Sequence, residues 1–246
     1  MNIIITGASR GIGYETAKIL CKEHKVIAIA RSVEKSKLPG VIPISFDFEK
    51  GNITKDLLPK ILSSLSSGRG TEGEATVDVL INNAATFIKK PFEQITRSEF
   101  EKVFCVNVFA IAELTQALLP LMSSPPMGET REGASHVLNI ASMGGIQGSV
   151  KFPGLSAYSS SKGALITLTE CLAEEYKQEK HMPAGRHVSF NAIAFGAVQT
   201  EMLKEAFPNF KAPITADEAA KFVSDFAING QKYFNGKVLQ MALNTP

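Results

Sequence analysis

Short runs of β-branched and other apolar residues alternate along the chain with longer stretches whose apolar residues follow helical spacing. This alternation is typical of βαβ units, in which parallel strands form one sheet and the connecting helices cover both of its faces. It predicts an α/β fold with a seven-stranded parallel sheet, its strands at Asn2–Thr6, Lys25–Ala30, Val41–Phe46, Val77–Asn82, Ser135–Ala141, Val188–Ala194 and Lys237–Met241. No internal repeat or linker divides residues 1–246, so we expect a single domain.

The two longest amphipathic stretches predict helices at Ser98–Met122 and Ser156–Lys180. The first carries a continuous apolar stripe, made of Val103, Val106, Ala110, Leu114, Ala117 and Leu118. Two segments rich in Ser, Gly, Glu or Pro, Ser63–Thr76 and Ser123–Gly133, predict loops. Because the second loop directly precedes a strand, we expect it at the edge of the sheet remote from the functional site.

Charge and cysteine usage narrow the classes of partner. The 26 basic and 24 acidic residues nearly balance, which argues against nucleic acid and acidic membrane surfaces as ligands. No apolar run approaches the roughly 18 residues that span a bilayer, and the start Met1–Ile5 lacks the basic region of a signal peptide. The cysteines, Cys21, Cys105 and Cys171, lie in predicted helices without metal-like spacing. We therefore expect no membrane segment, no metal site and a cytoplasmic location.

A glycine-rich turn, Thr6-Gly7-Ala8-Ser9-Arg10-Gly11-Ile12-Gly13, directly follows the first predicted strand and opens the first helix. Such a turn lets backbone N–H groups face a pyrophosphate, and a Cβ at the closest approach would collide with it. Gly7 would make the turn, while Gly11 and Gly13 would permit close approach and the packing of helix on strand. The position between strand and helix indicates a Rossmann-type, doubly wound dinucleotide-binding domain rather than a merely flexible turn.

The end of the second predicted strand bears on the choice of coenzyme. NAD-binding enzymes place a carboxylate there, about 20 residues after the glycine turn, to bind the ribose 2′-hydroxyl. This chain has Ala30-Arg31-Ser32 instead. The planar guanidinium of Arg31 suits a 2′-phosphate, so the sequence favours NADP(H). Arg10 either closes on the same phosphate or is a solvated loop cation.

Four tyrosines have a lysine at the fourth following position, which places the two groups on one helical face. The pairs are Tyr14 and Lys18, Tyr158 and Lys162, Tyr176 and Lys180, and Tyr233 and Lys237. The spacing alone therefore does not identify which tyrosine is catalytic. Tyr14 and Tyr176 have the surroundings of surface pairs, and Tyr233 precedes the turn Asn235-Gly236.

Tyr158 alone begins a helix that follows a strand ending in Ile140-Ala141-Ser142. Ser142 would thus lie at the carboxyl end of the sheet, where ligands of such folds bind. A free tyrosine has a pKa of about 10, so it needs a nearby positive charge to act as an acid or base near neutral pH. We expect Lys162 and an oxidised nicotinamide to supply that charge. Ser142 would hydrogen-bond the substrate oxygen.

With these residues in view, the chain resembles the short-chain dehydrogenase/reductase family over essentially its whole length. Tyr158 and Lys162 match its Tyr-x-x-x-Lys pair, and Ser142 matches its serine. The resemblance implies that Asn107 holds a water in a proton path to Lys162, and that Lys162 binds the nicotinamide ribose. The predicted catalytic residues are Asn107, Ser142, Tyr158 and Lys162.

Further coenzyme contacts follow from the same resemblance. Asn82-Asn83-Ala84-Ala85 is similar to the family's strand-four motif, whose small residues let the ribose pass. Asp47 would accept from the adenine amine, or else is a turn residue. The predicted coenzyme-binding residues are Gly7, Ser9, Arg10, Gly11, Ile12, Gly13, Arg31, Ser32, Asp47, Phe48, Asn83, Ala84, Ala85, Tyr158, Lys162, Val198 and Thr200.

Three features depart from the family pattern. Phe195-Gly196 stands where the family usually has Pro-Gly, which changes the expected shape of the loop at the nicotinamide amide. Ser142 and Tyr158 are sixteen residues apart, a few more than usual. The last strand lacks the customary Asp-Gly-Gly, which weakens any inference about how the C-terminus packs across subunits.

The leading hypothesis is an NADP(H)-dependent oxidoreductase that passes a hydride between the nicotinamide and a small carbonyl or alcohol, similar to a 3-oxoacyl reductase or a general carbonyl reductase. The alternative, a non-catalytic NADP(H)-binding sensor or scaffold, predicts loss of a catalytic residue, and all four are present. Apolar residues in Thr200–Pro213 suggest a partly hydrophobic substrate, without identifying it. The two long helices favour a homodimer or homotetramer, as is common in the family.

Overall fold

The computed structural model describes residues 1–32, 38–66, 76–122, 134–177 and 187–243. Seven parallel strands form the main sheet in the order β3-β2-β1-β4-β5-β6-β9. Their bounds are β1 Asn2–Thr6, β2 Lys25–Ala30, β3 Val41–Ser45, β4 Val79–Asn82, β5 Ser135–Ser142, β6 Val188–Phe195 and β9 Val238–Met241. The predicted α/β, Rossmann-type sheet is confirmed, with ends within two residues of those expected. A second, two-stranded sheet pairs β7 Val198–Gln199 with β8 Ile214–Thr215.

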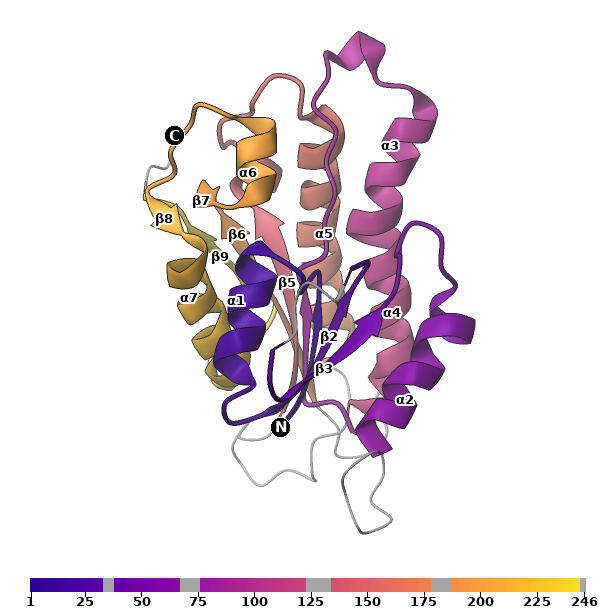
Figure 1. Ribbon diagram of the computed structural model, residues 1–246. Helices are drawn as coiled ribbons and strands as arrows, with labels where there is room; N and C mark the ends of the chain where they lie inside the picture. Colours follow the sequence, from indigo (N-terminus) through magenta and orange to yellow (C-terminus); the bar gives the residue numbers. More distant parts are fainter. Residues whose placement is uncertain (33–37, 67–75, 123–133, 178–186, 244–246) are drawn as a thin grey trace.

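Helices cover both faces of the sheet (Figure 1). Their bounds are α1 Gly11–Leu20, α2 Leu58–Ser66, α3 Arg97–Phe104, α4 Ala110–Leu118, α5 Ser156–Glu175, α6 Glu201–Ala206 and α7 Ala216–Asn229. Because successive residues of a strand point to opposite faces, β1 sends Ile4 into the core beneath α2 and α4 and sends Ile3 and Ile5 into the core beneath α1 and α7. This double burial explains the nearly continuous apolar runs in the sequence.

One predicted loop is partly wrong. Ser63–Ser66 form the last turn of α2, in which Leu65 anchors an otherwise polar segment to the core. The rest of that loop, residues 67–75, lies outside the described residues, as do the predicted loop 123–133 and the end of the second long helix, residues 178–180.

The first long helix is continuous but irregular. A π-helical segment, Cys105–Phe109, separates α3 from α4, and a 3-10 turn, Leu119–Leu121, ends the run. By length and composition the 25-residue stretch Arg97–Leu121 could cross a membrane, contrary to the sequence expectation. Its stripe of Val103, Ala110, Leu114 and Leu118 is buried, and the last three belong to the core against the sheet. This packing is that of a core helix.

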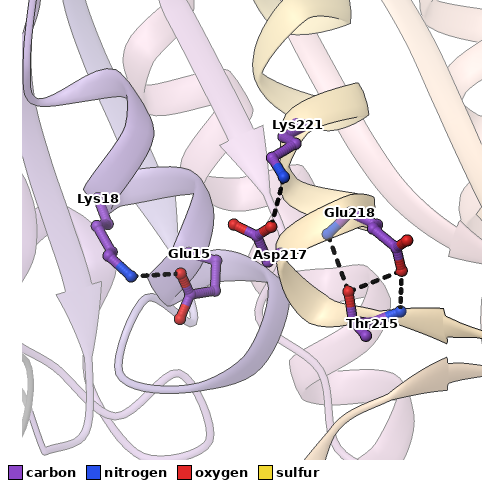
Figure 2. A network of polar contacts seen from close by, with 6 residues as sticks. All are labelled: Glu15, Lys18, Thr215, Asp217, Glu218 and Lys221. Atoms are coloured by element: carbon purple, nitrogen blue, oxygen red, sulfur yellow. Dashed lines mark hydrogen bonds and ion pairs between the residues drawn. The ribbon is translucent and has the colours of Figure 1, made fainter.

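Helices α1 and α7 lie side by side on one face of the sheet (Figure 1). Alanines at the contact, Ala17, Ala219 and Ala220, are buried and allow the helices to approach closely. Figure 2 shows the polar rim of this seam, where Lys18 pairs with Glu15 at 3.0 Å and Lys221 with Asp217 at 2.6 Å. Exposed pairs of this kind contribute only about 0–1 kcal/mol, so the buried alanines hold the seam.

A capping box begins α7 (Figure 2). The Thr215 hydroxyl accepts from the Glu218 backbone N–H, and the Glu218 carboxylate accepts from the Thr215 N–H at 2.8 Å. The two residues thereby satisfy N–H groups that the first helical turn leaves without partners. These bonds lower the pKa of the Glu218 carboxyl.

A buried carboxamide pair joins two central strands. Asn82 on β4 and Asn139 on β5 lie opposite each other in the register, and Asn82 Nδ2 donates to Asn139 Oδ1 at 2.9 Å. Asn139 Nδ2 in turn donates to Thr169 Oγ1 of α5 at 2.8 Å, and Asn82 Nδ2 lies 3.4 Å from Thr115 Oγ1 of α4. Hydrogen bonds between buried side chains therefore link α4 to α5 by way of β4 and β5.

A second buried polar group is His136 on β5, which is fully buried. Its Nδ1 lies 3.0 Å from the Ala227 carbonyl, and its Nε2 lies 3.1 Å from Asn191 Nδ2. The Asn191 amide is oriented by the Lys237 N–H, which donates to Oδ1. His136 Nε2 must accept, so the ring is neutral with its proton on Nδ1. Burial lowers its pKa from 6.5 to about 4.

This histidine makes stability depend on pH. Between pH 6.5 and about 4 the unfolded chain binds a proton at His136 that the folded chain does not, so stability is lost as pH falls through that window. We expect the free energy of unfolding to fall by about 3 kcal/mol across this window because of His136. Urea unfolding at successive pH values checks this. His136→Gln should flatten the profile and His24→Gln should not; equal profiles in both variants would contradict the prediction.

Candidate active site

A cleft of about 890 Å³ lies at the carboxyl ends of the strands, beside α6. Residues at the ends of all seven strands of the main sheet line it, including Gly7 after β1, Arg31 after β2, Asn83 after β4 and Ser142 at the end of β5. Strand order reverses between β1 and β4, which is where folds of this kind bind ligands.

The glycine turn has the backbone form that the sequence predicts. Gly7 and Gly11 have φ of +67° and +57°, a region that favours glycine. A Cβ on Gly7 would lie 2.8 Å from Ala84 Cα. Gly7, Ser9, Arg10, Gly11 and Ile12 line the cleft.

Gly13 does not line the cleft. It lies behind the turn, where an added Cβ would be 2.3 Å from Asn83 Nδ2 and 2.6 Å from the Gly7 oxygen. Its contribution to coenzyme binding is therefore indirect, through the packing of α1 against this turn.

Asn83 ties the turn to the neighbouring strand. Its Nδ2 donates to the Thr6 and Gly7 carbonyls at 3.0 and 3.1 Å, and the Thr6 hydroxyl accepts from the N–H groups of Asn83 and Ala84. The side chain satisfies another segment rather than its own backbone. Ala84 and Ala85, which follow it, line the cleft with small side chains.

The far end of the cleft carries the predicted coenzyme-selecting residues. Arg31 and Ser32 follow β2, Asp47 and Phe48 follow β3, and all four line the cleft. Arg31 is exposed, and its carbonyl accepts from Ser45 Oγ at 3.1 Å, whereas its guanidinium has no hydrogen bond or ion pair with other residues in the described ranges. Asp47 also serves as a turn residue, because its Oδ1 accepts from the Glu49 N–H at 2.9 Å.

Tyr158, Lys162 and Ser142 meet near the middle of the cleft. Lys162 is 1% exposed, and its Nζ donates to the Ile140 carbonyl at 2.7 Å. An ammonium has three donors, so two remain. Burial lowers the pKa of Lys162 to about 8. The ammonium lies 6.0 Å from the centroid of the Tyr158 ring.

The expected lowering of the Tyr158 pKa is absent in the chain alone. Burial raises the pKa, and a hydrogen bond with the Ser142 side chain opposes that effect only in part. The Ser142 hydroxyl also accepts from the Gly144 N–H at 3.1 Å, which fixes its position. At neutral pH the phenol is therefore protonated and able to donate to an oxygen placed between Tyr158 and Ser142.

Asn107 lies in the π-helical segment and is fully buried, behind the cleft wall. Its Oδ1 accepts from the Thr86 N–H at 2.8 Å, and its Nδ2 donates to the Thr86 carbonyl and to Ser161 Oγ, each at 2.9 Å. These bonds connect the loop after β4 to α5, close to Lys162. Both Nδ2 donors and one acceptor position of Oδ1 are thus used by the protein itself.

A family model described as short chain dehydrogenase matches residues 1–210. The chain belongs to the short-chain dehydrogenase family. The fold, the glycine turn and the Tyr-x-x-x-Lys helix described above are those of a short-chain dehydrogenase, and the resemblance seen in the sequence is confirmed.

Named relatives of this short-chain dehydrogenase include reductases. Carbonyl reductase (NADPH) 2 of Sus scrofa is 31% identical over 186 residues, which cover 73% of this chain and 67% of the relative. The 3-oxoacyl-(acyl-carrier-protein) reductase of Thermotoga maritima is 27% identical over 255 residues, covering 96% and 94%. A 3-ketoacyl-(acyl-carrier-protein) reductase of Brucella melitensis, solved with NADH, shares the fold with a TM-score of 0.78 at 22% identity, covering 97% and 95%.

The short-chain dehydrogenase loop after β6 departs from the family pattern at Phe195, which is buried at the strand end. Gly196 lets the chain approach β9, since an added Cβ would lie 2.8 Å from Ala242 Cβ. Val198 and Thr200 line the cleft as predicted. The Thr200 hydroxyl also caps α6 by accepting from the Leu203 N–H.

Thr86 and Phe87 of this short-chain dehydrogenase line the cleft, and they were not predicted as site residues from the sequence. Thr86 and Phe87 directly follow the Asn82–Ala85 motif, and Phe87 packs edge-on against Tyr158 with ring centroids 6.5 Å apart. Their position after a strand was the available signal. Within the described ranges no group of three or more His, Cys, Asp or Glu could hold a metal.

Proposed function

We propose that residues 1–246 form a single catalytic domain that reduces a small carbonyl compound with NADPH, or oxidises the corresponding alcohol with NADP⁺. The observation that carries this proposal is the meeting of the Tyr158 phenol, the Ser142 hydroxyl and the Lys162 ammonium at one cleft. Carbonyl and 3-oxoacyl reductases among the relatives support the same chemistry.

The residues at the glycine turn fit a dinucleotide. Gly7 and Gly11 line the cleft with bare backbone, and the small residues Ala84 and Ala85 line it beside them. Lys162 has donors left for ribose hydroxyls after its bond to Ile140. The bound nicotinamide supplies or accepts the hydride.

The protein residues handle the proton and the charge on the substrate oxygen. In reduction, Tyr158 donates its phenolic proton to the carbonyl oxygen, and Ser142 donates a hydrogen bond to the same oxygen. The Lys162 ammonium stabilises the phenolate that remains. Asn107 acts as a positioning residue that fixes Thr86 and Ser161 around Lys162. In oxidation the proton moves in the opposite direction.

The preference for NADP(H) rests on Arg31. Its guanidinium, which has no partner among the described residues, lies at the end of β2, where a ribose 2′-phosphate would be bound. The name of the Sus scrofa relative mentions NADPH, whereas the Brucella melitensis structure holds NADH. The charge at this position is what we propose decides between them.

Replacing Arg31 tests the coenzyme preference. We expect Arg31→Asp to lower the ratio of kcat/KM with NADPH to kcat/KM with NADH by about 100-fold, because it removes a charge-assisted hydrogen bond and adds a repelling charge. The measurement is coenzyme consumption across a panel of carbonyl compounds. Arg97→Asp makes the same charge change on an exposed residue of α3 and should leave the ratio unchanged. An unchanged ratio in Arg31→Asp would contradict the NADP(H) assignment.

We propose in addition that copies of the chain pair as a homodimer or homotetramer. On α3 and the π-helical segment, Phe104 contacts Phe109, which is 54% exposed. Sedimentation of a monomer at micromolar concentration would exclude this assembly. The three free cysteines support a reducing, cytoplasmic location, which fractionation of the source cells would test.

A further inference from the structure

We infer that the part of the cleft beyond Ser142 and Tyr158 binds a neutral carbonyl compound that carries an aromatic or similarly flat apolar group. This inference rests on the proposed function, because it assigns the glycine turn and the Arg31 end of the cleft to the coenzyme. The remaining wall is then the substrate half.

Apolar side chains from three segments form the substrate half. They are Phe87 after β4, Phe152 in the loop before α5, and Met202, Leu203, Phe207 and Phe210 on or just after α6. Phe152 and Phe210 are 54% and 50% exposed, so large apolar surfaces remain open to a ligand at the mouth of the cleft.

The aromatic rings are arranged around the reacting group. Phe87 packs edge-on against the Tyr158 ring. Phe152 meets Phe207 at a centroid distance of 5.3 Å and an interplanar angle of 63°. A flat ring can add to such a cluster in the edge-to-face or offset geometry that aromatic groups prefer. Thr86, Ser142 and Tyr158 supply few polar groups, and a polyol would leave most of its hydroxyls without partners.

Two lysines near this wall, Lys89 and Lys151, donate hydrogen bonds to other residues of the protein. Lys89 Nζ donates to the Ala206 carbonyl at the end of α6 at 2.6 Å and lies 4.1 Å from the Phe207 ring centroid. Lys151 Nζ donates to the Ile146 carbonyl and to two oxygens of Ser149 within 2.9 Å. Lys89 thus packs on Phe207, and neither Lys89 nor Lys151 lines the cleft.

The charged residues that line the cleft belong to its coenzyme half or to the reacting centre. Glu201 begins α6, but its carboxylate lies beside Gly11, 3.7 Å from the position of an added Cβ. Lys162 is bonded to Ile140 at the reacting centre. A carboxylate or phosphate on the substrate would therefore enter the apolar wall without a counter-charge, which is unfavourable.

A matched pair of ketones tests the inference. 4-Methylacetophenone and 4-acetylbenzoate have the same ring and carbonyl. They differ in the para substituent, which is a neutral methyl group in the first and a charged carboxylate in the second. With NADPH-loaded protein we expect kcat/KM for 4-methylacetophenone to exceed that for 4-acetylbenzoate by at least about tenfold. An equal or higher kcat/KM for 4-acetylbenzoate would overturn the inference while leaving the proposed function in place.

Phenylalanine variants locate the binding surface. We expect Phe152→Ala and Phe207→Ala each to raise KM for 4-methylacetophenone about five- to tenfold with a smaller effect on kcat, because each removes an aromatic contact. Phe92→Ala is the matched control, since Phe92 is 70% exposed and does not line the cleft. Unchanged KM in both cleft variants would overturn the inference.

Binding without turnover separates this inference from the proposed function. Ligand-observed NMR on the full chain with NADP⁺, which cannot reduce the ketone, measures the Kd of 4-methylacetophenone directly. If the ketone binds, and binds more weakly to Phe207→Ala, while no carbonyl is reduced with either coenzyme, the proposed function fails and the substrate assignment stands. If the ketone does not bind the wild-type protein, the substrate assignment fails, whatever else is reduced.

Discussion

Tyr158→Phe should lower kcat for carbonyl reduction by about 10²–10⁴-fold, the usual contribution of a general acid. The substitution removes the hydroxyl and keeps the ring, so the contact with Phe87 remains. The bond with Ser142 is lost together with the proton that the phenol would transfer. Steady-state NADPH oxidation gives kcat, and a fluorescence titration gives the Kd of the coenzyme, which we expect to change little.

Tyr176→Phe is the matched control for this prediction. Tyr176 follows the same helix, α5, and has the same four-residue spacing to a lysine in the sequence. Its ring packs on Phe190, away from the cleft. A Tyr158→Phe variant as active as Tyr176→Phe would remove the phenol from the mechanism.

Gly13→Ala should weaken both the fold and the binding of the coenzyme. The added Cβ would lie 2.3 Å from Asn83 Nδ2 and 2.6 Å from the Gly7 oxygen, so Asn83 must release its bonds to β1 and the glycine turn. We expect the free energy of unfolding to fall by about 1–3 kcal/mol, and the Kd of NADPH to rise by about tenfold or more through the loss of one to two hydrogen bonds.

Thermal or urea unfolding and coenzyme titration measure the two effects separately. Gly163→Ala on α5 is the comparison, because its added Cβ would meet one atom, the Gly145 oxygen at 3.3 Å, whereas at Gly13 two atoms lie below 3 Å, and alanine favours the helix. Equal stability and equal Kd for Gly13→Ala and the wild type would show that the close contact at Gly13 is relieved without cost.

Much of the fold and of the site could be predicted from local sequence. Apolar runs located the strands because a doubly covered sheet buries both faces of each strand. Context separated Tyr158 from the other tyrosines, since only it follows a strand that ends in a serine. The contact between Lys89 and Ala206 joins residues that lie 117 positions apart, and Phe87 contacts Tyr158 of another distant segment. No local pattern records such contacts.

Other features are hidden from periodicity. The π-helical segment at Cys105–Phe109 is five residues long, too short to disturb the apolar stripe of the helix around it. The pKa of Tyr158 could not be read from its spacing to Lys162, because it depends on burial of the phenol, to which Phe87 contributes, and on the hydrogen bond with Ser142. The neutral state of His136 likewise follows from its burial, and its tautomer from its contacts with Asn191 and Ala227 on two other elements.

The facing carboxamides of Asn82 and Asn139 help to set the register in which β4 pairs with β5. If β4 slipped by two residues along β5, Asn82 would stand beside Val137 or Ala141, and its amide would be stranded among aliphatic side chains. If β4 slipped by one residue, every side chain of the strand would move to the opposite face of the sheet. In the native alignment the two amides bond to each other and Asn139 also reaches Thr169 of α5, so the pair favours the correct register of β4 against β5 while the chain folds.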